Sequence, residues 1–128
     1  MVSFTCFNPS DVPEPVGGYS QSVSVAGASR LLFISGQIPE TDTGAIPEEF
    51  AEQCRLAWTN VLANLRAAGF NVDDLVKVTT YLTDRAYAEQ NRAVRRAVLG
   101  DAQPSSTVVV VGTLDPRWLL EIEAIAVR

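Results

Sequence analysis

Hydrophobic and polar residues repeat along this chain with two different periods, and each period predicts a type of element. Between Pro47 and Gly69, apolar residues recur every three or four positions, which is the period of a helix with one buried face. A second helix is expected from Asp84, which can cap its first turn, to about Leu99. Each helix should therefore cover another layer with one face. The apolar stripe of the first helix comprises Phe50, Cys54, Ala57, Trp58, Val61, Leu62, Leu65 and Ala68.

Alternating or β-branched runs predict strands in much of the remaining sequence. Segments 20–25 and 30–37 are expected to form a hairpin around the small residues 26–29, and residues 1–18 should be an extended lead-in with an edge strand. Two helices among these strands predict one α+β domain, residues 1–128, with a mixed β-sheet and both helices packed on one of its faces. Further strands are expected at 74–82, 107–111 and 119–127.

The last predicted strand carries two glutamates inside an otherwise apolar run. Side chains alternate along a strand, so Glu121 and Glu123 share one face while the opposite face is wholly apolar. A carboxylate removed from water must be paired, hydrogen-bonded or neutralised, and each of these states can serve an active site. A strand at the rim of the protein, with both glutamates in solvent, explains the pattern equally well.

Asn91 is the polar member of the apolar stripe on the second helix, whose other members are Tyr87, Val94 and Val98. An amide on a core-facing position must find hydrogen-bond partners or cost about 1 to 3 kcal/mol. Either the backbone satisfies Asn91, or its amide is available to a ligand.

Charge and composition narrow the possible chemistry. A net charge of −5 disfavours a surface that follows nucleic-acid phosphates. The chain has no histidine, which excludes Ser-His-Asp and Cys-His catalysis and histidine metal ligation. Cys6 and Cys54 lack the paired spacing of a disulfide framework or a zinc site. We therefore expect no metal, no cofactor and no membrane partner, and the absence of a secretion-type leader predicts a cytoplasmic protein.

Four segments match, in order, the motifs of a known family. They are GYSQ at 18–21, ISGQIP at 34–39, VKVTTYLTD at 76–84 and EIEAIA at 121–126. The chain therefore resembles the RidA (YjgF-like, reactive intermediate deaminase) family over nearly its whole length. The resemblance implies a chorismate-mutase-like fold and a homotrimer whose sheets face inward, with small-molecule clefts between subunits. The best-known members of this family hydrolyse 2-imino and enamine acids to 2-keto acids and ammonia, and the resemblance implies no cofactor.

The same motifs indicate the site residues that the resemblance implies. Glu121 and Tyr19 match the catalytic positions, and Ser35, Gly36 and Asn91 match positions that line the cleft. The family's substrate-binding arginine, in a Pro-Ala-Arg-Ser-Thr motif, is absent. The corresponding segment reads Gln-Pro-Ser-Ser-Thr at 103–107, which places Ser105 at the arginine position, or Ser106 if the alignment shifts by one residue.

A serine hydroxyl cannot replace a guanidinium, which is permanently charged and binds a carboxylate through two parallel hydrogen bonds. Two hypotheses follow from this substitution. The protein is a deaminase or hydrolase of imine or enamine intermediates, with a substrate that differs from standard 2-imino acids. Alternatively, it is a non-catalytic trimeric protein that binds a small molecule in the same cleft. Arg30 and Arg117 are other possible cations for the cleft, although a solvated surface position suits each of them better.

Overall fold

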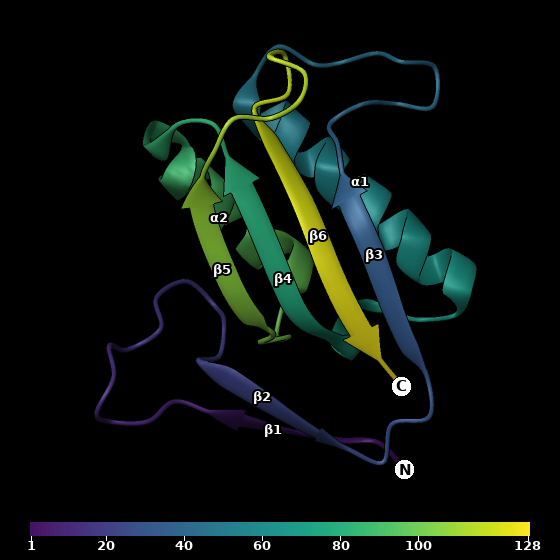
Figure 1. Ribbon diagram of the computed structural model, residues 1–128, viewed down its shortest axis with the longest axis vertical. Coiled ribbons are helices and arrows are strands. Elements are labelled where there is room, and N and C mark those ends of the chain that lie inside the picture. The colour runs from purple at the N-terminus through teal and green to yellow at the C-terminus, as the bar shows by residue number, and fades with distance from the viewer.

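A four-stranded mixed sheet forms the body of the molecule, with the strand order β3-β6-β4-β5 (Figure 1). The computed structural model describes all residues, 1–128. Strands β4 and β5 are parallel, whereas β6 is antiparallel to both of its neighbours, β3 and β4. This arrangement confirms the predicted mixed sheet. The four strands are β3 (Leu31–Gln37), β4 (Leu75–Leu82), β5 (Ser105–Val110) and β6 (Leu120–Val127).

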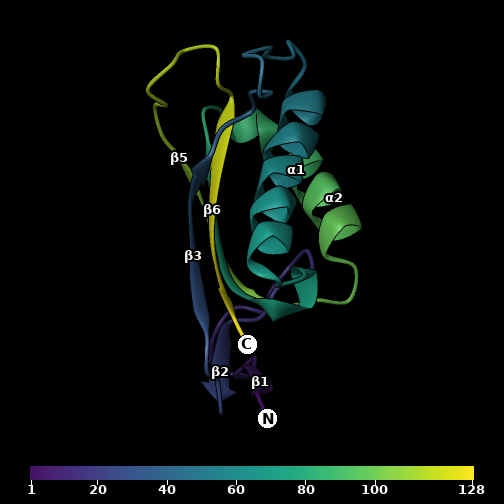
Figure 2. The same cartoon turned by 90° about the vertical axis from the view of Figure 1, so that its right-hand side faces the viewer.

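Two helices, α1 (Phe50–Ala68) and α2 (Ala88–Leu99), cover the same face of this sheet, as predicted (Figure 2). Asp84 acts as a cap, but its carboxylate accepts from the Ala86 N–H and so begins a short 3-10 turn ahead of α2. A second 3-10 turn precedes β4. The two turns are Val72–Asp74 and Arg85–Tyr87. Neither helix is long and apolar enough to cross a membrane.

The core lies between the helices and the sheet. The predicted face of β6 is confirmed, because Leu120, Ile122, Ala124 and Ala126 are all buried while Glu121, Glu123 and Ile125 lie on the other face. The helix stripe packs against them, and burial of these apolar side chains is the main favourable contribution to folding. The buried members of that stripe are Phe50, Cys54, Ala57, Trp58, Val61 and Leu65.

The first two strands form a separate sheet, and the predicted hairpin of segments 20–25 and 30–37 is wrong. Strand β2 (Ser22–Ala26) pairs with β1 (Ser3–Phe7), and this pair lies beside one end of the larger sheet (Figure 1). The N–H groups of Ser29 and Arg30 both donate to the carbonyl of Arg128 at 2.8 Å. The chain therefore enters β3 already paired with the end of β6, so the turn does not fold β2 back onto β3.

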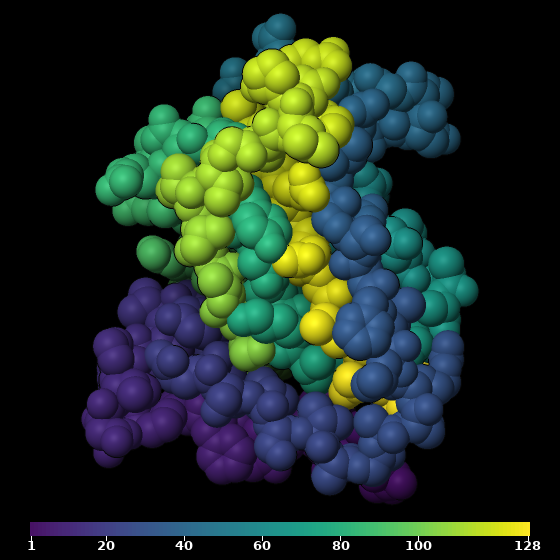
Figure 3. Space-filling view, viewed as in Figure 1, coloured from purple at the N-terminus to yellow at the C-terminus, as the bar shows by residue number.

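The face of the larger sheet opposite the helices is open. Figure 3 shows the middle of its strands at the surface, while the loop between β5 and β6 lies in front of their upper end. Apolar side chains stand on this face, and Leu31 and Phe33 are 61% and 69% exposed. Exposed apolar side chains on an uncovered sheet face can mark an interaction site.

Candidate functional site

The segment that carries Tyr19 is hydrogen-bonded to the residues that lead into β5. The Ser20 hydroxyl donates to the Gln103 carbonyl at 2.7 Å, and the Ser20 N–H donates to the Pro104 carbonyl at 3.1 Å. Ser20 is itself buried and forms an isolated bridge with Ser105. These bonds hold Tyr19 beside the first residues of β5, even though the two segments are far apart in sequence.

Asn91 reaches the same place from α2. Its Oδ1 accepts a weak hydrogen bond from the Cys54 Sγ of α1 at 3.8 Å, and no hydrogen bond of the chain uses its Nδ2. The side chain is 2% exposed, yet it lines a cavity. The backbone does not satisfy this amide, which leaves its N–H groups available to a ligand.

Tyr19 and Asn91 share a cavity of about 300 Å³ between α2, the helix-facing side of β5 and the segment around residue 16. A cavity of this volume lies at the lower end of the range for small-molecule sites. The side chains that give it polar character are Tyr19, Asn91, Arg92, Arg95 and Ser106.

Arg95 is the cation of this cavity, and the sequence analysis missed it. The side chain is 4% exposed, and its Nη2 donates to the Gly17 carbonyl at 2.9 Å. The guanidinium carbon lies 5.8 Å from the centre of the Tyr19 ring. Burial lowers the pKa of Arg95 below its usual range, and the nearby positive charge of Arg92 adds to this effect. A signal was present in the sequence, because residues four apart share one helix face and Arg95 follows Asn91 by four.

Gly17 permits the close approach of its segment to α2. Its φ of +98° lies in the left-handed region, which side-chain-bearing residues rarely adopt. A Cβ atom there would lie 2.8 Å from Arg95 Nη2 and from Arg92 Cγ. The loop can therefore close over the two arginines only where position 17 has no side chain.

The predicted catalytic Glu121 lies elsewhere, on the open face of the sheet. Its carboxylate packs against Gly36 of β3, where a Cβ atom would come within 1.9 Å of Glu121 Oε2. Gly36 lies within an irregularity of the β3–β6 pairing, and bulges of this kind commonly adjoin functional sites. Glu121 and Gly36 therefore form a second group, separate from the cavity of Tyr19 and Asn91.

Glu123 lies two residues further along the same face, and its carboxylate already has a hydrogen-bond partner in this chain. The Tyr81 hydroxyl donates a hydrogen bond to its carboxylate. This bond raises the pKa of Tyr81 above its usual value, with a smaller contribution from desolvation. Of the two glutamates, Glu121 is the one that makes no hydrogen bond through its side chain.

The two predicted serines also lie outside the cavity. Ser35 stands on the open face near Lys77 and Glu123. The Ser105 hydroxyl donates to the Val76 carbonyl at 2.8 Å and bridges β5 to β4. Ser106, not Ser105, lines the cavity with Tyr19 and Asn91, and its buried hydroxyl has no partner.

Arg30 and Arg117 are both engaged far from the cavity. Arg117 forms an ion pair with Asp115, with Nη2 to Oδ2 at 2.7 Å, and this hydrogen bonding lowers the pKa of Asp115. Arg30 donates to the Ala68 carbonyl at 2.6 Å and stacks over the Phe70 ring at 4.6 Å. Neither arginine takes the place of the family arginine that this chain lacks.

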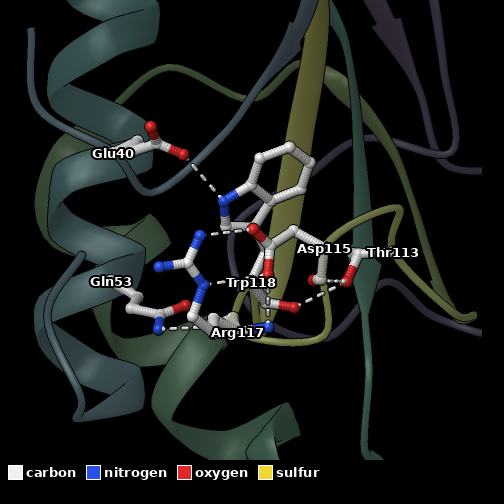
Figure 4. A network of polar contacts seen from close by, with 6 residues as sticks. All are labelled: Glu40, Gln53, Thr113, Asp115, Arg117 and Trp118. Atoms are coloured by element: carbon white, nitrogen blue, oxygen red, sulfur yellow. Dashed lines mark hydrogen bonds and ion pairs between the residues drawn. The ribbon is translucent and has the colours of Figure 1, made fainter. Parts of the chain in front are cut away.

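A polar network fixes the loop that leads into β6 and so places Glu121 (Figure 4). Gln53 of α1 is 1% exposed, accepts from the Leu119 N–H at 2.8 Å and donates to the Arg117 carbonyl at 2.9 Å. The Trp118 indole N–H donates to Glu40 Oε2 at 3.0 Å. Buried networks with satisfied partners are rigid, so the start of β6 is well defined.

The fold and these groups define a small α+β protein with a polar ligand cavity at one edge of its sheet and a carboxylate on the open face. No cluster of three or more cysteine, aspartate and glutamate side chains could hold a metal ion. Arg92 and Arg95 bring positive charge to the cavity, and its other polar side chains can form hydrogen bonds.

Comparison with known proteins identifies the family. Residues 9–128 match the family model described as Endoribonuclease L-PSP. A RutC family protein of Pyrococcus horikoshii is 38% identical over 120 residues, which are 92% of this chain and 93% of the relative. The 2-iminobutanoate/2-iminopropanoate deaminase of Escherichia coli is 34% identical over 122 residues, with the same coverage of 92% and 93%. The chain therefore belongs to the RidA (YjgF-like) family, as its motifs predict.

Solved structures agree with this assignment. YyfB of Yersinia pestis, a protein of the Rid family, superposes with a TM-score of 0.84 at 25% identity and 98% coverage of both chains. TdcF of Escherichia coli with bound serine superposes with a TM-score of 0.73 at 35% identity, covering 97% of this chain and 98% of that one. The fold is thus that of the family along the whole chain.

Proposed function

We propose that this protein hydrolyses 2-imino or enamine acids to 2-keto acids and ammonia in clefts between the subunits of a homotrimer. The observation that carries the proposal is the convergence of Tyr19 and Asn91 on one cavity, with an Asn91 Nδ2 that donates to no group of the protein. The 2-iminobutanoate/2-iminopropanoate deaminase of Escherichia coli supports this choice of reaction. The serine bound to TdcF supports a small ligand that carries a carboxylate.

The division of the predicted residues into two groups has a simple explanation in such a trimer. Tyr19 and Asn91 belong to the cavity at the β5 edge, whereas Glu121 and Gly36 face the open side of the sheet. In the proposed trimer, the β5 edge of one subunit, where the cavity lies, meets the open face of the next subunit, so that Tyr19 and Asn91 lie next to the neighbour's Glu121. The exposed apolar side chains on that face, Phe33 at 69% among them, are consistent with such a contact.

The proposed reaction needs one water molecule and one group that moves a proton. The water oxygen forms a bond to the imine carbon while the carboxylate of Glu121 accepts a proton from the water. Glu121 passes this proton to the imine nitrogen, which becomes an amine on a tetrahedral carbon that also bears a hydroxyl. The hydroxyl proton is then transferred to the amine nitrogen, the carbon–nitrogen bond breaks, the oxygen becomes the keto group, and ammonia leaves. Tyr19 and Asn91 supply hydrogen-bond donors that orient the substrate within the cavity.

Ribonuclease activity, which the family description names, fits this chain poorly. Binding to a nucleic-acid backbone depends mainly on neutralising its phosphates with lysine and arginine. This protein carries a net charge of −5. The arginines around the cavity form a local cluster on α2 and not a track along the surface.

The test is the rate of 2-oxobutanoate formation from 2-iminobutanoate that is generated in situ, compared with a protein-free control. Native protein should accelerate hydrolysis well above background. Glu121→Gln should lower the rate by about 10² to 10⁴-fold, because it removes the proton acceptor. Glu123→Gln is the matched control, since it makes the same change on the same face, and it should retain most of the rate. No acceleration by native protein would contradict the proposal and favour the non-catalytic binding protein.

A further inference from the structure

Arg95 is a buried cation without an acidic partner. The ion pairs of the chain are Arg55 with Glu52 and Arg117 with Asp115, and neither involves Arg95. Its Nη2 meets only the Gly17 carbonyl, and its Nε is buried without any hydrogen-bond partner. An unpaired buried charge is costly, and proteins usually retain one only where it has a function.

A second orphaned polar group lines the same cavity. The Ser106 hydroxyl is buried without a partner, as is the Nε of Arg95, and both residues line the cavity with Tyr19 and Asn91. A buried polar group without a partner loses hydrogen bonds that it had in water. A ligand with several acceptor lone pairs would satisfy the guanidinium and the hydroxyl together, and a carboxylate is the simplest such group.

Electrostatics favour an anion at this position. Arg92 lines the cavity beside Arg95, and the pKa of Arg95 is lowered first by burial and then by the charge of Arg92. A bound anion would offset the charge repulsion between the two arginines. Hydrogen bonds between a guanidinium and a carboxylate are shorter and stronger than neutral ones.

We propose that Arg95 binds the carboxylate of the substrate and thereby replaces, from helix α2, the family arginine that is absent from β5 of this chain. Ser106 of β5 and Arg95 of α2 line the same cavity. The identity of the ligand as a 2-keto or 2-imino acid rests on the proposed function. The anion site itself rests on the orphaned groups of Arg95 and Ser106.

The first test is calorimetric binding of 2-oxobutanoate, the expected product, which needs no turnover. Arg95→Met should weaken binding by about tenfold or more, as expected for the loss of a charge-assisted contact. Arg96→Met is the matched control, because Arg96 is exposed on the same helix and the same charge is removed. Its affinity should stay within about twofold of native, since it lies outside the cavity. Equal affinities of the native and Arg95→Met proteins would overturn the proposal.

A second measurement uses native protein and does not depend on how a variant folds. A buried arginine Nε–H gives an observable NMR resonance, and addition of 2-oxobutanoate should shift that of Arg95. The uncharged analogue 2-butanone should not shift it. An unchanged Arg95 resonance at saturating 2-oxobutanoate would contradict carboxylate binding. An equal shift at equal concentrations of inorganic phosphate would show a general anion site and would also overturn the assignment.

Binding and activity measurements together distinguish failure of the Arg95 carboxylate site from failure of the proposed deaminase activity. Binding of 2-oxobutanoate that depends on Arg95, without any hydrolysis of 2-iminobutanoate, would retain the carboxylate site and remove the enzyme activity. Hydrolysis that Arg95→Met leaves unchanged in both kcat and KM would retain the activity and remove Arg95 from the site. If both hold, the loss of affinity should raise KM in Arg95→Met more than it lowers kcat.

Discussion

At the scale of single residues, the contact between Gly36 and Glu121 shows how a sequence position is constrained by a neighbouring strand. Glycine at position 36 leaves just enough room for the carboxylate of Glu121, which lies on the adjacent strand β6. The irregular pairing of β3 with β6 occurs at this point. The carboxylate of Glu121, the proposed proton acceptor, can therefore occupy this position only because residue 36 has no side chain.

Gly36→Ala should displace Glu121 with little damage to the fold. The added Cβ would lie 1.9 Å from Oε2, at the end of a side chain that can rotate away. We expect a change of less than about 1 kcal/mol in the free energy of unfolding. The rate of imine hydrolysis should fall by about tenfold or more, because misplacing a catalytic group is costly. Denaturant unfolding and the deamination assay measure the two effects.

Gly112→Ala is the control for this substitution. A Cβ atom at Gly112 would meet nothing within 4 Å, so both stability and rate should stay close to native. A Gly36→Ala protein with native activity would show that the position of Glu121 does not matter for the reaction.

At the scale of elements, α1 packs against α2 and contacts Asn91, which lines the cavity. Cys54 of α1 is fully buried, and its thiol contacts the Asn91 amide on α2. Burial raises the pKa of the Cys54 thiol to about 12, from an ordinary value of 9.0. The thiol therefore remains protonated in the folded protein under conditions in which it ionises in the unfolded chain.

This difference predicts how stability depends on pH. Between pH 9 and about pH 12, unfolding releases the Cys54 proton, so the free energy of unfolding should fall as the pH rises. The slope for one proton is at most about 1.4 kcal/mol per pH unit. Cys54→Ala should lower stability at every pH by opening a small cavity, but it should make the fall in stability above pH 9 shallower, with the raised pKa of Tyr81 as a remaining contribution.

Urea unfolding between about pH 8 and about pH 10.5 measures this slope. Cys6→Ala is the control, since Cys6 is exposed on β1 and its removal should leave the slope unchanged. If the native protein and Cys54→Ala lose stability in parallel above pH 9, the buried thiol does not contribute to the pH dependence.

The elements differ in how far their sequence predicts them. Both helices and the two faces of β6 follow from local periodicity, and the structure confirms them. The β2–β3 hairpin was predicted from the same local rules, but Ser29 and Arg30 pair with the distant Arg128 instead. Local patterns do not reveal such competition between a turn and a remote strand.

The site residues also differ in how far the sequence predicts them. Tyr19 and Asn91 were predicted from motifs and share a cavity in the structure, whereas Arg95 was overlooked. Its burial depends on the closure of the Gly17 segment over α2, which the helical pattern alone does not show. On an isolated helix, a run with Arg92, Arg95 and Arg96 has the composition of a solvated face.

At the scale of the whole molecule, the predicted site residues of one chain lie in two separate places. The cavity with Tyr19 and Asn91 lies on the helix-facing side of β5, and Glu121 lies on the open face of β6. The exposed apolar side chains of that face give a physical reason for association, since covering them removes apolar area from water. We therefore expect each complete site to take Glu121 from one subunit and Asn91 from its neighbour.

Activity in mixed trimers tests this arrangement most directly. Glu121→Gln and Asn91→Leu chains with different affinity tags are co-expressed, and trimers that contain both chains are isolated through both tags. Each variant alone should be inactive. In a mixed trimer, about one third of the clefts combine a native Glu121 with a native Asn91 from the adjacent chain, so about one third of the native deamination rate should return. Mixed trimers that stay as inactive as the two parent variants would show that neighbouring subunits do not share the site.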